Sequence, residues 1–234
     1  RIYVGKRSSR HTMSQEDINE LLVKEAREGR RVVRLKGGDP FLFGRGGEEV
    51  EALVRNGISF EIVPGITSAV AVPAFQGIPV THRDLCSSLH IVTGHKRAGV
   101  SYDIDFGALV RAGGTLVFLM GAAALGDICR GLLDGGMKPD TPAALLMEGT
   151  TAHQQRITAT VSTLEGEARK REVRTPALIV VGEVCALADQ FSWYEKLPLA
   201  GVKVALTRPE ERMAGMAMKL RTLGAEVLEG PPMR

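Results

Sequence analysis

Two kinds of hydrophobic pattern alternate along the chain. In the first kind, apolar residues recur at helical spacing: Ser14 and Asp17 form a capping box, and the pattern that follows runs to Gly29. In the second kind, a short β-branched or Leu-rich run stops at a glycine or at a Pro-Gly pair. Six runs of this second kind predict strands, at residues 31–35, 60–63, 89–92, 115–120, 143–147 and 178–181.

Helix-length segments separate several of these runs, at residues 46–56, 67–76 and 122–135. The alternation predicts an α/β fold with substantial parallel pairing. Residues 155–161 alternate between apolar and polar positions, which favours an antiparallel strand and therefore a mixed sheet in the second half. In such sheets ligands bind beyond the carboxyl ends of strands, where glycine allows close approach of the backbone. The alternative is that these glycines only end strands and cap helices.

The alternation of predicted strands and helices is interrupted twice, which suggests two domain boundaries. A polar stretch at residues 94–105 separates two predicted α/β lobes, and the rhythm restarts after Pro198 with a strand at 202–206, a helix at 210–223 and a strand from 225. We therefore expect domains at residues 1–94 and 95–196, followed at 197–234 by a linker and the start of a further module. Because Arg1 stands within a strand-like run, we also expect the chain to be a fragment of a longer protein.

Composition limits the classes of function. The 234 residues are 44% hydrophobic and 24% charged, which excludes a disordered or collagen-like chain, and the uncharged stretch 62–82 is broken by proline and glycine, which argues against a membrane span. The net charge of +3 is too small to indicate nucleic-acid binding, although residues 1–36 hold ten Lys and Arg against five Asp and Glu. Cys86, Cys129 and Cys185 lie far apart, which predicts neither a disulfide framework nor a metal site and fits the cytoplasm.

The segment from Lys36 to Glu49 carries the most specific pattern: a Gly-Gly-Asp turn after a predicted strand, then a second glycine-rich loop that enters a helix. It is neither a dinucleotide-binding fingerprint nor a P-loop. Asp39 could bind a ribose or an ammonium group, and Arg45 could bind a carboxylate through two hydrogen bonds. The alternative makes Asp39 a turn former and pairs Arg45 with Glu49 on the helix surface.

These residues resemble the signature of the uroporphyrinogen-III C-methyltransferases, a branch of the tetrapyrrole methylase family. Further matching segments are residues 3–7 with 10–11 and 15–19, residues 63–69, and residues 77–84, and the likeness continues through 93–95 and 175–177 to about residue 195. The resemblance implies two α/β lobes with S-adenosylmethionine bound in the cleft between them and S-adenosylhomocysteine as its product.

The resemblance also assigns the cofactor contacts. They fall on residues at or near the ends of the predicted strands: Gly37, Gly38, Asp39, Leu42, Thr67, Ser68, Met120, Gly149 and Ala177. A methionine that ends a buried strand is also typical of a core, so Met120 has a packing role as its alternative. Thr67 and Ser68 would equally suit a helix N-cap.

The substrate that the resemblance implies is uroporphyrinogen III, a polycarboxylate macrocycle methylated on pyrrole carbons. Arg45 and Arg83 match substrate-binding positions, and Glu48 could orient Arg45 or accept a hydrogen bond from a pyrrole N–H. Lys6 matches a position that the family uses as a proton donor, with a solvated strand end as its alternative. The implied catalytic residues are thus Lys6, Arg45 and Glu48.

Family members begin with a strand and a Gly-Pro-Gly-Asp-Pro loop that this chain lacks, so we expect residues 1–234 alone to be weakly active or inactive. Residues 202–209 and 223–227 resemble the opening of a uroporphyrinogen-III synthase, which suggests a bifunctional parent. The implied role is methylation towards precorrin-2 in sirohaem or cobalamin synthesis by a cytoplasmic homodimer, without metal, nucleic acid or membrane. The alternatives are another methylase of the same fold and a non-catalytic ligand-binding module.

Overall fold

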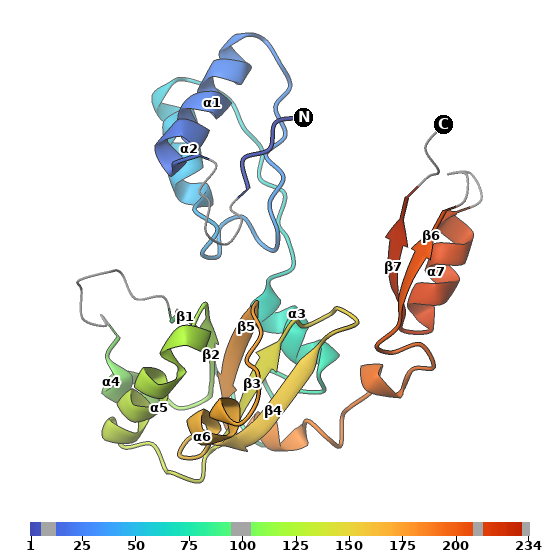
Figure 1. Cartoon of the computed structure of the whole chain (residues 1–234). Coiled ribbons are helices and arrows are strands. Elements are labelled where there is room, and N and C mark those ends of the chain that lie inside the picture. Colours follow the sequence, from blue (N-terminus) through green and yellow to red (C-terminus); the bar gives the residue numbers. More distant parts are fainter. Residues whose placement is uncertain (6–12, 95–103, 208–212, 231–234) are drawn as a thin grey trace. The chain divides into compact units, whose positions relative to one another are not determined.

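The computed structural model describes residues 1–5, 13–94, 104–207 and 213–230, which group into two compact units, Arg1–Thr67 and Ser68–Arg234 (Figure 1). The observed division falls earlier than the boundary expected at residue 94, because strand β1 (Leu89–Thr93) pairs within the sheet of the second unit. The predicted domains 1–94, 95–196 and 197–234 remain a prediction.

Two helices form the folded part of the first unit. Helix α1 (Gln15–Arg27) begins with the predicted capping box between Ser14 and Asp17, and α2 (Gly46–Arg55) follows the second glycine-rich loop. The two helices lie side by side and bury Ile18 and Ala52 (Figure 1). The first helix was predicted from its capping box and apolar periodicity, and the second from a helix-length segment after a glycine-rich loop; both are confirmed.

The strands predicted at residues 31–35 and 60–63 do not form among the described residues, so these two predictions were wrong. Both runs are extended, but no ladder of strand hydrogen bonds joins them. Val33 is 81% exposed and Leu35 is 84% exposed. Strand preference mainly reflects packing on a sheet, and an isolated pair of strands has little stability of its own, so the apolar pattern alone does not create strands here.

The second unit is built on a five-stranded mixed sheet with the order β1-β2-β5-β3-β4. Only β1 and β2 are parallel neighbours, whereas the β2–β5, β5–β3 and β3–β4 pairs are antiparallel. The mixed α/β fold class and the antiparallel strand near residue 155 are confirmed, but the emphasis on parallel pairing was wrong. The strands are β2 (Thr115–Leu119), β3 (Pro142–Met147), β4 (Gln155–Thr160) and β5 (Ala177–Val181), besides β1.

Helices cover both faces of this sheet. One face packs against α4 (Phe106–Ala112), α5 (Leu125–Asp134) and α6 (Leu164–Arg169), and the other packs against α3 (Ser68–Phe75) and the short 3-10 helix η2 (Glu183–Leu187). Alternate residues of each strand point to opposite faces, so Phe118 enters the first core and Val117 the second. A further 3-10 turn, η1 (Ala122–Ala124), precedes α5.

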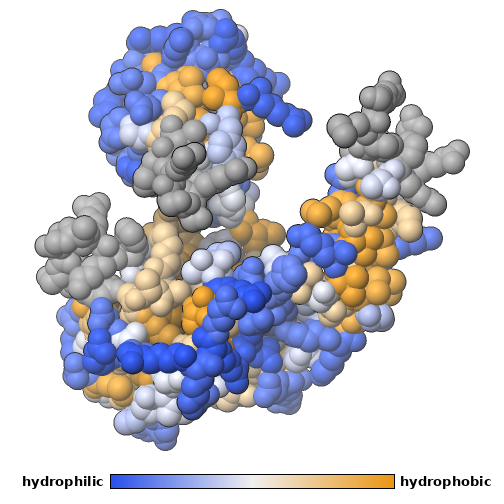
Figure 2. Space-filling model, viewed as in Figure 1, coloured by the Kyte–Doolittle hydropathy of each residue, from blue (hydrophilic) through white to orange (hydrophobic). Residues whose placement is uncertain are grey.

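The chain ends in a small α/β segment that comprises η3 (Tyr194–Lys196), β6 (Lys203–Leu206), α7 (Ala214–Thr222) and β7 (Glu226–Glu229). The predicted order of strand, helix and strand after Pro198 is confirmed, and strands β6 and β7 are parallel. This segment carries much hydrophobic surface, which includes Met218 at 69% exposed (Figure 2). Across the described part of the chain, no helix is both long and apolar enough to span a membrane.

Candidate functional site

Three of the predicted cofactor residues meet at one edge of the sheet in the second unit. Leu119 pairs with Leu178, and Met147 pairs with Ala177, so the ends of β2 and β3 and the start of β5 lie together. Met120 and Gly149 follow the first two of these strand ends, and Ala177 begins the third strand. The register therefore brings Met120, Gly149 and Ala177 to the same edge, although one of the strands runs in the opposite direction.

Left-handed backbone marks this edge and the glycine-rich loop of the first unit. Five described non-glycine residues have a positive φ, and all of them lie in these two regions: Phe43, Arg45, Met120, Glu148 and Thr150. Such conformations are unfavourable for residues with a Cβ and tend to cluster at ligand and active sites. This backbone observation selects the two predicted site regions independently of the sequence motifs.

Met120 is exposed rather than buried. Every residue of β2 is buried, but Met120, directly after it, is 54% exposed and has φ 58°. Its side chain therefore does not pack in the core, and the packing alternative for this residue is wrong. An exposed thioether at this edge can contact an apolar or aromatic ligand surface.

Glu148 is a residue of this edge that the sequence analysis missed. Its backbone N–H donates to Pro176 O at 2.8 Å, its φ is 46°, and its Oε2 atom is buried without a hydrogen-bond partner among the described residues. Buried carboxylate oxygens are normally hydrogen-bonded, so this atom is a free acceptor at the edge. An acidic residue inside Met-Glu-Gly-Thr could have drawn attention, but nothing in its spacing indicates a buried oxygen.

Asp39 is held by its own loop. Its Oδ1 accepts from Phe41 N at 2.9 Å and Leu42 N at 3.2 Å, and its Oδ2 accepts from Gly65 N at 3.1 Å. The Gly65 and Phe41 N–H groups lower the pKa of this carboxyl below its ordinary value. Asp39 is thus the turn former that the alternative described, and it also joins the Gly37–Leu42 loop to the segment before α3. A carboxylate has about four acceptor positions, which leaves one for a ligand.

Glycines in and around this loop allow close backbone contacts. A Cβ on Gly65 would stand 2.1 Å from Gly38 O, and a Cβ on Gly46 would stand 2.4 Å from Pro40 O. Gly38 itself has φ 71°, and a Cβ on Gly37 would meet nothing within 4 Å. The loop therefore has a tightly packed inner side at Gly65 and Gly46, with open space at Gly37 that a flat ligand could use.

Arg45 and Glu48 lie at the start of α2. Arg45 precedes the helix in a left-handed conformation, and its Nε and Nη2 atoms donate to Glu48 Oε1 at 2.7 Å and Oε2 at 2.5 Å. Glu48 raises the pKa of the Arg45 guanidinium. The predicted orientation of Arg45 by Glu48 is observed, whereas Glu49, the partner in the surface-pair alternative, is buried and binds other cations.

The other predicted site residues are less closely defined. Thr67 directly precedes α3 and Ser68 is its first residue, which fits the N-cap alternative. Arg83 is exposed in a turn closed by the bridge between His82 and Cys86. Lys6 lies outside the described residues. Because Arg83 belongs to the second unit and Arg45 to the first, their meeting at one substrate stays a prediction.

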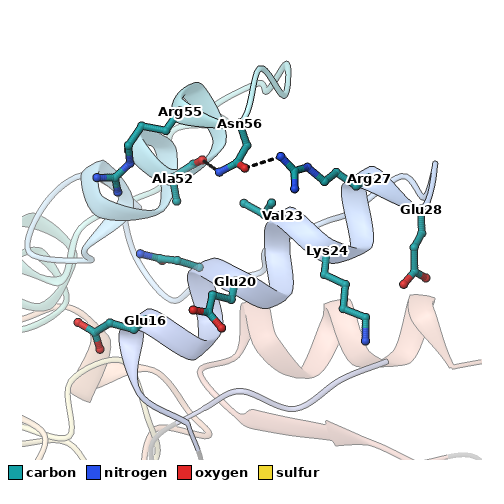
Figure 3. A pocket seen from close by; sticks show the side chains of 10 residues that line it. Glu16, Glu20, Val23, Lys24, Arg27, Glu28, Ala52, Arg55 and Asn56 are labelled. Carbon is teal, nitrogen blue, oxygen red and sulfur yellow. Dashed lines mark hydrogen bonds between the residues drawn. The ribbon is translucent and has the colours of Figure 1, made fainter.

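A surface groove of about 630 Å³ runs between α1 and α2 in the first unit (Figure 3). Arg27 of α1 donates to Asn56 Oδ1 at 2.7 Å across it, and Asn56 donates to Ala52 O. None of the predicted site residues lines this groove. In the described ranges, no group of three or more His, Cys, Asp or Glu side chains could hold a metal ion.

Comparison with known proteins relates most of the chain to one family. The family described as Tetrapyrrole (Corrin/Porphyrin) Methylases matches residues 1–165. A protein of Ruminiclostridium josui named porphyrin biosynthesis protein HemD is 52% identical over 231 residues, which is 99% of this chain and 46% of that protein. A siroheme synthase of Chromobacterium violaceum is 48% identical over 87% of this chain and 43% of its own length. The chain thus spans less than half the length of these relatives.

Solved structures give the same result. The uroporphyrin-III C-methyltransferase of Thermus thermophilus, crystallised with S-adenyl homocysteine, is 40% identical with a TM-score of 0.66, over 79% of this chain and 77% of that protein. A cobalt precorrin-4 methyltransferase is 26% identical with a TM-score of 0.67, over 74% of this chain and 73% of that protein. The glycine-rich loop of the first unit and the strand edge of the second unit therefore lie on a chain that belongs to the tetrapyrrole (corrin/porphyrin) methylase family.

Proposed function

We propose that this chain catalyses S-adenosylmethionine-dependent C-methylation of uroporphyrinogen III, towards precorrin-2 in sirohaem or cobalamin synthesis. The observation that carries the proposal is the 40% identity, over most of both chains, to a uroporphyrin-III C-methyltransferase whose structure holds S-adenyl homocysteine. The motif from Lys36 to Glu49 and the left-handed backbone at both site regions support it.

The residues present fit the cofactor. In the first unit, the open side of Gly37 and the remaining acceptor position of Asp39 suit a flat ligand that carries hydrogen-bond donors. In the second unit, exposed Met120 and the buried acceptor Glu148 Oε2 suit an adenosine with an apolar face and polar groups. When bound, S-adenosylmethionine supplies an electrophilic methyl group on a sulfonium centre.

The chain's own residues would bind and orient the substrate. Arg45, held by Glu48, presents a guanidinium to a substrate carboxylate, and Arg83 would bind a second carboxylate. The cation formed when a pyrrole carbon accepts a methyl group must lose a proton from a neighbouring position of the macrocycle, and Lys6 would serve in proton transfer. Since the pyrrole is already electron-rich, positioning is the main contribution that catalysis requires from the protein.

The direct test is methyl transfer from labelled S-adenosylmethionine to uroporphyrinogen III by the full-length protein, together with calorimetry of S-adenosylhomocysteine binding. Methylated product and measurable binding are expected. Binding without methylation of any tetrapyrrole would support the non-catalytic ligand-binding module instead. No binding and no product would refute the proposal.

A corrin methylase is the second candidate, supported by the TM-score of 0.67 with the cobalt precorrin-4 methyltransferase. The identity to that protein is 26%, against 40% for the uroporphyrin-III enzyme. Supplying both classes of macrocycle to the same preparation separates the two candidates. Faster turnover of a corrin precursor than of uroporphyrinogen III would favour the second.

We further propose that the protein works as a cytoplasmic homodimer and that β6, α7 and β7 begin a uroporphyrinogen-III synthase module. The match to the Ruminiclostridium josui protein covers 99% of this chain, so it extends through this segment. Light scattering after size exclusion tests the dimer. Conversion of hydroxymethylbilane to uroporphyrinogen III by the full-length protein tests the module, and a monomer or a lack of conversion would contradict the respective proposal.

A further inference from the structure

A buried carboxylate lies next to the proposed cofactor loop of the first unit. Glu49, on α2, is 5% exposed. Its Oε2 accepts from Lys36 Nζ at 2.8 Å, and its Oε1 accepts from Arg34 Nε at 3.2 Å. The Nε2 atom of Gln15, on α1, donates to Oε1 at 3.3 Å. One acidic side chain therefore connects α1, α2 and the extended segment before Gly37.

The extended segment turns its charged side chains inward. Arg34 and Lys36 are two residues apart, so they share one side of the extended backbone, and both reach Glu49. The Lys36 side chain is only 12% exposed. Val33 and Leu35 occupy the opposite side and are exposed. Glu49, Arg34 and Lys36 therefore form an ion cluster that joins this segment to the helices.

Lys36 is the residue directly before Gly37, so its attachment to Glu49 fixes the start of the loop. Pro40 O accepts from Gly46 N at 3.0 Å near the other end, and Asp39 Oδ2 accepts from Gly65 N. Each end of the Gly37–Leu42 loop thus has its own anchor. Glycine backbone is otherwise free to change conformation, so the position of this loop depends on these anchors.

We propose that Glu49 is a positioning residue for the cofactor loop, acting through Lys36 on Gly37, Gly38 and Asp39; this role rests on the proposed function. Buried ion pairs contribute little net stability, because desolvation offsets most of the attraction between the charges. They do impose a defined geometry when every charge has a partner, which is the requirement of a loop that must present backbone groups to a ligand.

The test compares Glu49→Gln with Glu51→Gln in the full-length protein, because Glu51 lies on the same helix but is exposed. For Glu49→Gln we expect the dissociation constant of S-adenosylhomocysteine and the KM for S-adenosylmethionine to rise roughly tenfold, while kcat at saturating cofactor changes less than about threefold. Without ligand, amide hydrogen exchange at residues 37–42 should accelerate in Glu49→Gln alone.

Unchanged cofactor affinity and unchanged exchange in folded Glu49→Gln would overturn the positioning role. If Glu49→Gln does not fold, Lys36→Met decides instead, since it keeps the aliphatic stem and removes the ammonium. Weakened binding and faster exchange in Lys36→Met would support the role, and wild-type behaviour would overturn it. A wild-type protein that binds no S-adenosylhomocysteine would refute the proposed function, an outcome distinct from equal binding by wild type and variant.

Discussion

The guanidinium of Arg45 forms a two-point ion pair with Glu48, with Nε–Oε1 at 2.7 Å and Nη2–Oε2 at 2.5 Å. The Arg45 side chain is 42% exposed, so the pair is open to solvent and can be reached by a ligand. An incoming carboxylate would bind the remaining N–H donors of Arg45 or replace Glu48. Before substrate binds, Glu48 fixes the orientation of the Arg45 guanidinium. Less side-chain conformational entropy is therefore lost on binding.

Replacement of Arg45 should separate substrate binding from cofactor binding. In Arg45→Ala, kcat/KM for uroporphyrinogen III should fall about 100-fold, because a charge-assisted contact of roughly 2–3 kcal/mol is lost. Binding of S-adenosylhomocysteine should stay within about threefold of wild type. Arg55→Ala, at the other end of α2, is the matched control and should keep activity. Equal losses of substrate turnover in both variants would contradict a specific role for Arg45.

Asp39 should make the first unit sensitive to acid. Its pKa is lowered in the folded state by N–H groups, first that of Gly65, so the carboxylate contributes stability above the ordinary pKa of about 3.9. This contribution is lost as the pH falls through the lowered folded value. Hydrogen exchange of the Gly65 amide, measured from pH 6 to pH 3, should therefore accelerate at the acid end after correction for intrinsic rates.

Asp39→Asn should remove most of this pH dependence, because its amide does not ionise. Asp134→Asn, in α5 of the second unit, should leave the Gly65 profile unchanged. A profile that is the same in Asp39→Asn as in wild type would show that another group controls the exchange.

Two glycines of the first unit should respond in opposite ways to alanine. A Cβ on Gly65 would stand 2.1 Å from Gly38 O, so Gly65→Ala must push the two segments apart and should reduce the free energy of unfolding by about 1–3 kcal/mol. A Cβ on Gly47 meets nothing within 4 Å, and its position in α2 favours alanine by about 0.5 kcal/mol. Denaturant titration measures both, and a Gly65→Ala protein as stable as wild type would contradict the close packing.

The strands that were predicted correctly are those whose burial matches their apolar sequence. All residues of β2 and nearly all of β3 and β5 are buried between two helical layers, so a continuous apolar run was a sufficient signal. The runs 31–35 and 60–63 are also rich in apolar residues, but they contain Arg31, Arg34 and Glu61 and form no ladder, and the sequence does not state whether a partner strand is present. Strand direction was also predicted wrongly, because the sequence pattern does not show which strands become neighbours. Strand β5 is antiparallel to both of its neighbours, β2 and β3.

The site residues show the same limit. The motif from Lys36 to Glu49 identified the loop and gave Asp39 a turn-forming role as its alternative, yet it did not reveal that Glu49 is buried between two cations. Glu148 escaped notice because its free oxygen results from burial, which depends on tertiary packing. Local spacing therefore identifies a candidate segment, but it does not show which side-chain atoms of that segment have free hydrogen-bonding positions.

Variants at Gly149 can show whether packing or ligand binding requires a glycine at this position. A Cβ there would stand 2.4 Å from Val72 Cγ1 of α3, so Gly149→Ala alone should reduce the free energy of unfolding by about 1–3 kcal/mol. Its φ is not among the positive values, so backbone strain adds no separate cost. Val72→Ala removes the clashing methyl groups, and the two changes together should cost less than their sum by about 1 kcal/mol or more.

The double variant then separates the effect of Gly149→Ala on packing from its effect on ligand binding. If Gly149 only accommodates Val72, then Gly149→Ala in the Val72→Ala background should bind S-adenosylhomocysteine as tightly as Val72→Ala itself. If the cofactor also approaches this backbone, binding should remain weakened by roughly tenfold although the steric clash is relieved. We expect the second result, because Gly149 shares its edge with exposed Met120 and with the buried acceptor Glu148. Calorimetry on the three variants and wild type measures the difference directly, and full recovery of affinity in the double variant would remove Gly149 from the proposed cofactor site.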